Sequence, residues 1–439
     1  MKVGIIQFPG TNCFRESSMA VKRAGMESVP LLWNEDPSRM ESCDGFILAG
    51  GFSYEDRSRS GIIAALDPLM DTVKKAVSAG KPVLGICNGA QILVEANLVP
   101  GFATQLPAAA LTTNKRVSKT KLIGTGFYNA WINLRCELQH GAMDSRLCAF
   151  TMAIPQGEVL RIPTAHTEGR FILADDVLQA VRDLNLIPFR YADDQGDIDP
   201  SFPVNPNGSV DNIAALTNYA GNVMAVMPHP ERTSAGDPLF TSMRMYMEGR
   251  RASAEPITLP PALTIRSIEE SMYAASLTRY IRNTHAEEIV TELIITDNAA
   301  VSVENTLQQL GIPVTVTRRM HWEITFSQDI SADEQTAILE AVHGCGELYN
   351  SNKERLIRTP DKTGSWSVLV RERDDICGLH AHQALTSWFS ISGITSVRRG
   401  TIWDLSAESG SISEVQIQQV LDTHILMNPH AHKGYIYEG

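Results

Sequence analysis

Short apolar runs alternate with amphipathic stretches over the first hundred residues of the chain. The apolar runs at 3–8, 29–32, 45–49 and 83–86 are expected to form buried strands. Between them, apolar side chains recur at helical spacing in the segments 17–24, 61–79 and 90–96. Strands that alternate with helices predict an α/β fold with a doubly wound, mainly parallel sheet. Such a sheet binds its ligand at the carboxyl ends of its strands, where we expect the loops 9–14, 50–60 and 87–89.

The pattern changes twice further along the chain. From about residue 106 the strands become shorter and the turns more polar, and residues 251–261 are rich in Ala, Ser and Pro. We therefore expect a first domain over residues 1–250 and a linker over 251–261. A smaller α+β region is expected to follow over residues 262–439.

This smaller region contains a candidate internal repeat. Residues 288–326 and 366–405 each predict a strand, a helix and a long strand, and a helix and a closing strand follow in both copies. The segments 316–322 and 396–403 are also similar, since both carry an Arg-Arg pair followed by Trp. The order β-α-β-β-α-β is ferredoxin-like. Two tandem copies, at 262–360 and 361–439, are thus a hypothesis, because two short matches can arise by chance.

Composition narrows the class of protein. The chain has 439 residues, a hydrophobic fraction of 43% and a formal net charge of -12. The negative charge argues against nucleic acid as a partner and, more weakly, against anionic membranes. The first apolar run is too short for a signal peptide, and no run is long enough to cross a bilayer. Seven scattered cysteines, with no C-x-x-C pair, indicate reduced thiols in the cytoplasm.

One of these cysteines lies in a pattern that is typical of a nucleophile. Residues 85–89 read Gly-Ile-Cys-Asn-Gly, with a buried strand before them and a short helix after them. This is a nucleophile elbow with cysteine in the central position, and a helix N-terminus behind Cys87 favours the reactive thiolate. The backbone N–H of Asn88 and the Gly-Gly-Phe loop at 50–52 are candidate donors to an oxyanion. The alternative is a buried structural cysteine in a glycine-rich turn.

A second segment offers the base that a thiol nucleophile needs. His229 and Glu231 stand two residues apart between prolines, so in an extended chain their side chains lie on the same side. Glu231 would then orient the imidazole while His229 faces the sulfur of Cys87. The alternative is a surface loop with a solvated His and Glu.

Other polar clusters carry less information. His166 and Glu168 lie in a turn after a strand and are as consistent with a structural role as with contact to a substrate. The pairs His380/His382 and His430/His432 have no cysteine or carboxylate cluster beside them, so no metal site is expected. No P-loop and no G-x-G-x-x-G motif is present, and no nucleotide or other cofactor is expected in this chain.

Five motifs together resemble a known family. They are Phe-Pro-Gly-Thr-Asn-Cys at 8–13, Gly-Gly-Phe-Ser-Tyr at 50–54, the elbow at 85–89, Asn-Pro-Asn-Gly-Ser at 205–209 and Met-Pro-His-Pro-Glu-Arg at 227–232. Over residues 1–250 the chain resembles the glutaminase subunits of phosphoribosylformylglycinamidine synthase, which are class I glutamine amidotransferases. That enzyme performs a step of de novo purine synthesis.

The resemblance implies both chemistry and partners. It implies hydrolysis of L-glutamine by a triad of Cys87, His229 and Glu231, with Gly51 and Phe52 in the oxyanion loop. It also places Gln91 close to the bound glutamine. The ammonia would pass to a large synthetase subunit on another chain, and ATP and magnesium are expected there.

The C-terminal region, most clearly 365–438, is similar to the small subunit of the same enzyme, which bridges glutaminase and synthetase as a dimer. Three residues depart from the family pattern: Phe14 and Glu55 replace Asp and Gly, and Thr167 replaces Gly. Two other functions remain open. The chain could be a catalytically weak or inactive scaffold or regulatory subunit, or a different amidase with a cysteine nucleophile.

Overall fold

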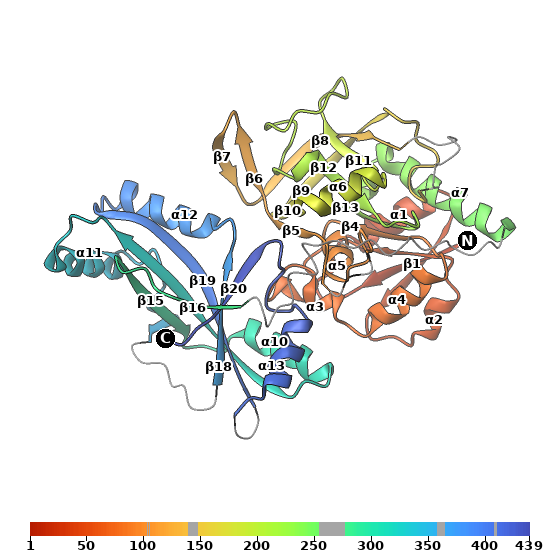
Figure 1. Ribbon diagram of the computed structural model, residues 1–439. Helices are drawn as coiled ribbons and strands as arrows, with labels where there is room; N and C mark the ends of the chain where they lie inside the picture. The colour runs from red at the N-terminus through yellow and green to blue at the C-terminus, as the bar shows by residue number, and fades with distance from the viewer. Residues whose placement is uncertain (103, 105, 139–147, 254–276, 358–364, 408–410) are drawn as a thin grey trace. The chain divides into compact units, whose positions relative to one another are not determined.

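The computed structural model forms two compact units, Met1–Glu270 and Ser271–Gly439 (Figure 1). It describes residues 1–102, 104, 106–138, 148–253, 277–357, 365–407 and 411–439. Each unit has a large sheet of its own. Within the described residues, no helix has the length and apolar character required to cross a membrane.

The N-terminal unit is built on a mixed sheet of nine strands. Their order across the sheet is β2 (Glu27–Leu32), β1 (Lys2–Gln7), β3 (Gly45–Leu48), β4 (Val83–Ile86), β13 (Val223–Val226), β12 (Ile213–Thr217), β11 (Phe189–Ala192), β8 (Tyr128–Cys136) and β9 (Val159–His166). The first five strands run parallel to one another, and the remaining neighbours pair antiparallel. The α/β class is confirmed, and antiparallel strands extend the parallel half.

Helices cover both faces of the parallel half, so β3, β4 and β13 are buried along their whole length. In Figure 1, α1 and α7 lie above these strands, and α4 and α5 lie below them. The helices of this unit are α1 (Phe14–Arg23), α2 (Ser38–Glu41), α3 (Ile62–Ala65), α4 (Leu69–Ser78), α5 (Asn88–Glu95), α6 (Asp175–Asp183) and α7 (Asp237–Ser253).

The helix predicted over 61–79 is wrong as a single element, because the structure breaks it into α3 and α4. Pro68 lies between them; it cannot donate a backbone hydrogen bond, and it disfavours helical geometry in the preceding residue. Asp67 adds a local alternative, since its Oδ1 accepts from the N–H of Leu69 at 2.9 Å. The apolar periodicity continues across the break, which is why the sequence pattern alone predicted one helix.

Parallel strands bring four loops to one edge of the sheet. The chain leaves β1, β3, β4 and β13 at their carboxyl ends, and these ends meet at the same edge. A two-stranded ribbon of β5 (Ala110–Thr113) and β10 (Glu168–Ile172) follows the end of β9, and β6 (Lys115–Ser118) pairs with β7 (Lys121–Thr125). The predicted loops 9–14, 50–60 and 87–89 are three of the four.

The C-terminal unit has one sheet of seven strands. Its order is β14 (Thr278–Arg279), β20 (His432–Ile436), β18 (Ser365–Glu372), β19 (Ile394–Ala407), β16 (Val314–Phe326), β15 (Ala286–Leu293) and β17 (Glu354–Leu356). The helices are α10 (Asn298–Gln309), α11 (Ala332–Cys345), α12 (Ile376–Gln383) and α13 (Glu414–Asp422). A π-helical turn, Ala384–Trp388, extends α12.

The two halves of this sheet have the same order of elements. One half runs β15, α10, β16, α11 and β17, and the other runs β18, α12, β19, α13 and β20. The long strands β16 and β19 pair antiparallel at the centre, where Met320 lies opposite Thr401 and His321 opposite Gly400. Of the predicted linker, residues 251–253 belong to α7, and residues 254–261 lie outside the described part of the chain.

The substitution Gly89→Ala tests how tightly the first turn of α5 packs on β3. A Cβ at Gly89 would lie 1.9 Å from the carbonyl oxygen of Leu48, so Gly89→Ala must displace backbone. We expect this variant to lower the free energy of unfolding of the N-terminal unit by about 3 kcal/mol or more. Urea denaturation followed by tryptophan fluorescence measures the change.

The matched control is Gly249→Ala, because Gly249 lies in α7 with open space around its Cβ. There the same substitution should be neutral or stabilise by about 1 kcal/mol through helix propensity. Equal stability of the two variants would contradict the close approach of α5 to β3.

Candidate active site

Cys87 lies at a strained turn between β4 and α5. Its backbone angles are φ 52° and ψ -106°, a region that residues with a side chain rarely adopt. The flanking glycines permit the turn, since a Cβ at Gly85 would lie 2.4 Å from the carbonyl oxygen of Gly89. The N–H of Cys87 donates to Val226 O at 2.9 Å, and α5 begins at the next residue. The thiol therefore stands at a helix N-terminus, where the helix dipole favours a negative charge.

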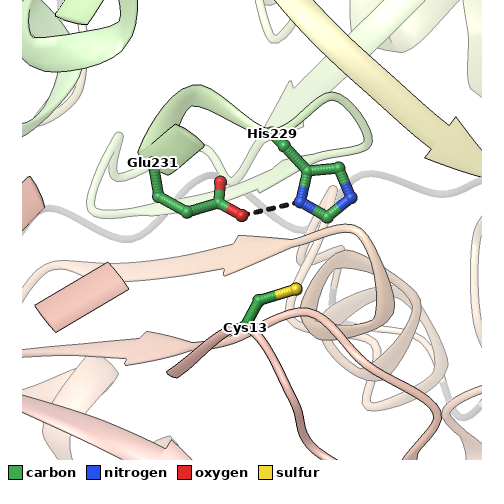
Figure 2. Close-up of side chains that lie close together, drawn as sticks. All are labelled: Cys13, His229 and Glu231. Carbon is green, nitrogen blue, oxygen red and sulfur yellow. Dashed lines mark hydrogen bonds and ion pairs between the residues drawn. The ribbon is translucent and has the colours of Figure 1, made fainter. Parts of the chain in front are cut away.

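His229 and Glu231 form a buried pair directly after β13. The Nδ1 of His229 lies 2.6 Å from Oε1 of Glu231 (Figure 2), and the residues are 2% and 1% exposed. The backbone N–H of His229 donates to Pro163 O at 2.8 Å, which fixes the segment against β9. Because a carboxylate only accepts hydrogen bonds, Nδ1 carries a proton, and Nε2 is left for another partner.

The pKa of His229 depends on the charges of both Glu231 and Cys87. Burial acts to lower the pKa of His229, but the negative charges of a Cys87 thiolate and of Glu231 outweigh it and raise that pKa well above its usual range. His229 also lines the same pocket as Cys87. The site thus favours the protonated form of His229 in the pocket that also holds Cys87.

A second thiol lies beside His229 and Glu231. Cys13 precedes α1, and its Sγ, a ring nitrogen of His229 and a carboxylate oxygen of Glu231 all lie within 4.8 Å of one another (Figure 2). These are donor types that bind zinc. Here, however, Arg232 donates to the Sγ of Cys13 at 3.1 Å and forms an ion pair with Glu231 at 3.7 Å. The guanidinium thus already supplies positive charge to this cluster.

The loop after β3 forms one wall of the site. The N–H of Phe52 donates to Gly10 O at 3.0 Å, and the N–H of Ser53 donates to Oδ1 of Asn88 at 2.9 Å. The next three residues, 54–56, all have positive φ, at 51°, 57° and 52°. Hydrogen bonds to two other loops therefore hold the wall in a conformation that is costly for residues with side chains.

The loops enclose a pocket of about 360 Å³, within the range of small-molecule sites. Five of the predicted site residues line it, namely Gly51, Phe52, Cys87, Gln91 and His229. The other two lie behind its wall, where Glu231 contacts His229 and Asn88 contacts Gln91. The pocket is also lined by Asn12, Cys13, Asp56, Ser60, Phe127, Ala165, His166, Thr167, Glu168 and Arg232.

Sequence reasoning left several of these pocket residues without a role. Cys13 and Arg232 belong to motifs that were recognised, and Asp56 follows one of the departures, so their position in the motifs was the available signal. His166 and Glu168, whose role the sequence left open, both line the pocket. The departing residues Phe14, Glu55 and Thr167 are all exposed, and of these only Thr167 is among the residues that line the described pocket.

Comparisons with known proteins find relatives of the N-terminal unit. A profile described as a CobB/CobQ-like glutamine amidotransferase domain matches residues 1–239. The chain is 40% identical over 270 residues to phosphoribosylformylglycinamidine synthase subunit PurQ of Methanothrix thermoacetophila, covering 57% of this chain and 100% of that protein. It is 41% identical over 234 residues to the PurQ subunit of Pyrococcus horikoshii, covering 53% and 90%. A chain in the structure of PurLQS from Thermotoga maritima is 31% identical and covers 56% and 98%, with a TM-score of 0.43.

Glu231→Gln tests the charge that holds the imidazolium. The variant keeps an oxygen for Nδ1 but removes the carboxylate charge, so the pKa of His229 should fall and its proton should be lost at lower pH. The thiolate of Cys87 then loses its cationic partner. We expect alkylation of Cys87 by iodoacetamide at pH 6 to slow about tenfold or more, and the two rates to converge at high pH, as measured by mass spectrometry of the Cys87 peptide.

Glu55→Gln is the control, since it removes a carboxylate whose side chain is 75% exposed and lies outside the pocket lining. It should leave the profile of rate against pH unchanged. An unchanged profile in Glu231→Gln would show that the carboxylate does not hold the charge of His229.

Proposed function

Because the chain belongs to the glutamine amidotransferase family, we propose that it is the glutaminase component of phosphoribosylformylglycinamidine synthase. Two relatives that are named as subunits of this synthase are 40% and 39% identical to the chain, over 100% and 98% of their own length. The observation that carries the chemistry is the elbow: Cys87 shares a pocket with His229, and Glu231 holds the other side of the imidazole. L-Glutamine is the proposed substrate.

In the proposed mechanism, the Cys87 thiolate attacks the side-chain amide carbon of glutamine. His229, protonated at Nε2, gives its proton to the departing ammonia, and a glutamyl thioester remains on the sulfur. Water then loses a proton to His229 and attacks the thioester, which releases glutamate and restores the thiolate. Glu231 keeps the imidazole oriented and balances its charge in both steps.

Backbone N–H groups would stabilise the oxyanion that forms in each step. Asn88 offers its N–H at the start of α5, and Gly51 offers one from the loop after β3. The N–H of Phe52 already donates to Gly10 O, so a role for it requires that this bond be exchanged. Gln91 donates to Glu168 O at 2.6 Å and lines the pocket, which fits a place beside the bound glutamine.

Ammonia released here would be used by a large synthetase subunit on another chain. The relatives are named as subunits of a synthase, which implies such a partner. ATP and magnesium would bind to the synthetase, which forms the amidine from formylglycinamide ribonucleotide. All seven cysteines are free thiols, and we place the reaction in the reducing cytoplasm.

Cys87→Ala tests the proposed reaction directly. Glutamate release from L-glutamine is measured with and without the candidate synthetase, ATP and ribonucleotide. We expect the wild-type protein to release glutamate, the partner to raise the rate, and the variant to lose at least a thousandfold because the thiol at the elbow is removed.

Two outcomes would favour other functions. Release without any response to the synthetase, together with cleavage of other amides, would indicate a general amidase. No release by a folded protein within an assembled complex would indicate a scaffold.

The C-terminal unit is proposed to bridge this glutaminase to the synthetase. Its two halves repeat one order of elements, and the similar segments around Arg318 and Arg398 lie opposite each other at the centre of the β16–β19 ladder. This is the contact expected between two copies related by a twofold axis. We infer that tandem copies replace a dimer of separate small subunits within one chain.

Removal of residues 262–439 tests the bridging role. The shortened chain should keep the pocket, so iodoacetamide should alkylate its Cys87 at the wild-type rate. It should lose complex formation with the synthetase in size-exclusion chromatography, because the bridging surface is gone. Normal binding by a shortened chain with intact Cys87 reactivity would contradict the proposal.

A further inference from the structure

The C-terminal sheet buries a group of charged side chains on one of its faces. Side chains alternate along β16, and Trp322 and Ile324 face a hydrophobic cluster that includes residues of α11 and α12. His321 and Glu323 face the other way, yet they are only 0% and 5% exposed. On β18, Arg371 is 3% exposed. Buried charges are costly unless they are paired, so the partners of this group decide whether it is stable.

His321 is held between a carboxylate and a guanidinium. Its Nδ1 lies 3.3 Å from Nη2 of Arg371, and its Nε2 lies 3.0 Å from Oε1 of Glu288. Because a guanidinium only donates hydrogen bonds, Nδ1 is an acceptor, and the proton of the neutral ring is on Nε2 and donates to Glu288. Arg371 Nη2 also donates to Oε2 of Glu323 at 3.4 Å, and its buried Nε has no hydrogen-bond partner within the described residues. The neutral form of His321 therefore fits both of its neighbours.

The chain enters this sheet through a short segment, residues 277–282, which we call the latch segment. Its strand β14 is two residues long and lies at the edge of the sheet beside β20. The N–H of Tyr280 donates to Ile436 O at 2.8 Å. Few backbone bonds hold the segment, which makes it a candidate for local opening. Its ion pairs join exposed side chains and contribute little; they are Arg279–Glu438 and Arg282–Glu287.

Tyr280 connects the latch segment to the buried group. Its hydroxyl donates to Oε2 of Glu323, and its ring centre lies 5.5 Å from that of His321. The guanidinium of Arg371 lies 5.1 Å from the centre of the same ring, a cation–π contact that gains strength where water is excluded. Glu323 and Arg371 therefore contact Tyr280 while their charges also act on His321.

Several elements direct titratable or charged groups at His321. Burial lowers the pKa of His321, and the charge of Arg371 lowers it further, against the opposing effect of Glu288 and Glu323. The central strand β19 places the uncharged Gly400 directly opposite His321. The groups around the ring are Tyr280 of the latch segment, Glu288 of β15, Glu323 of β16, Arg371 of β18 and Tyr437 after β20, with Arg398 of β19 opposite Glu323.

We propose that the latch segment is closed on the sheet while His321 is neutral and that uptake of a proton by His321 opens it. A proton on Nδ1 faces an N–H of Arg371 across 3.3 Å, so a hydrogen bond is lost and two like charges stand together in a buried place. Movement of Arg371 relieves this repulsion, and it also withdraws the guanidinium from the ring of Tyr280. The chain is then attached to the sheet through β15 instead of β14. This behaviour belongs to the C-terminal unit and does not depend on glutamine hydrolysis.

The direction of the pH effect follows from the two shifted groups. A free histidine takes up its proton near pH 6.5, and the closed latch binds that proton less readily, so acid favours the open form below about pH 6.5. For Glu288, burial acts to raise the pKa, but hydrogen bonds from His321 and Tyr280 outweigh it and hold that pKa below its usual range. Its contribution is therefore lost only below about pH 4.3. Between these values the proton on His321 can be followed apart from the one on Glu288.

Hydrogen exchange of the full-length protein, measured by mass spectrometry, tests the latch segment. The peptide over residues 277–283 contains the amide of Tyr280, and its exchange is compared at about pH 7.5 and about pH 5.5 after correction for the intrinsic effect of pH. We expect the opening equilibrium of the wild-type segment to rise about fivefold to tenfold at the lower pH, the limit that one proton sets. His321→Gln should remove this rise, because an amide can donate to Glu288 and accept from Arg371 but takes up no proton.

Two further variants separate the latch from a general effect of acid. His285→Gln is the matched control, because His285 is an exposed histidine close to the latch segment, and it should keep the wild-type response. Tyr280→Phe removes the hydroxyl that donates to Glu323, so it should raise opening about tenfold already at neutral pH. Peptides from the β16–β19 ladder report whether each variant is folded.

Several results would overturn the proposal. Equal opening of the wild-type segment at both pH values, or a full response retained in His321→Gln, would show that His321 does not control the segment. An equal rise in the β16–β19 ladder would show that acid loosens the whole sheet. If His321→Gln fails to fold, Tyr280→Phe still decides, because opening no greater than in the wild-type protein would contradict the role of Tyr280.

Discussion

The hydrogen bond from Cys87 N–H to Val226 O joins the two halves of the site. It continues the parallel pairing of β4 with β13 by one residue beyond the end of β4. Cys87 and the His229 segment are separated by more than a hundred residues in the sequence, yet this register fixes where both segments leave the sheet. The angle of the elbow, the start of α5 and the place of the imidazole all follow from that pairing.

Loops around this junction hold one another through side chains that also belong to the site. Asn88 accepts from the loop after β3 and donates both to Asp56 and to Gln91. Gln91 in turn donates to the backbone of Glu168. The first turn of α5 thus connects the loop after β3 to the turn between β9 and β10. A substitution at Asn88 should act on several walls of the pocket together, because one amide serves all of them.

Local patterns in the sequence were sufficient to predict many of the helices and strands and the turn at Cys87. The strand 83–86 was predicted with the bounds that the structure has, since its apolar run lies within the segment itself. The break at Pro68 was missed because apolar spacing continues through it. Cys13, Asp56 and Arg232 reach the pocket only through the meeting of separate loops, so no spacing in the sequence could place them together. The positive φ at Glu55 was equally hidden, as it depends on hydrogen bonds made by its neighbours.

The central ladder of the C-terminal unit, formed by β16 and β19, affects how that sheet responds to dilution and to amino-acid substitution. Its two halves belong to one chain, so β16 and β19 cannot separate when the protein is dilute, as the strands of two associated subunits can. Identical subunits must also carry each residue twice. Halves that are encoded separately are free of this restriction, and here His321 lies opposite Gly400 while Met320 lies opposite Thr401. One side of the sheet can therefore adapt to one neighbour and the other side to a different one, without a compromise between them.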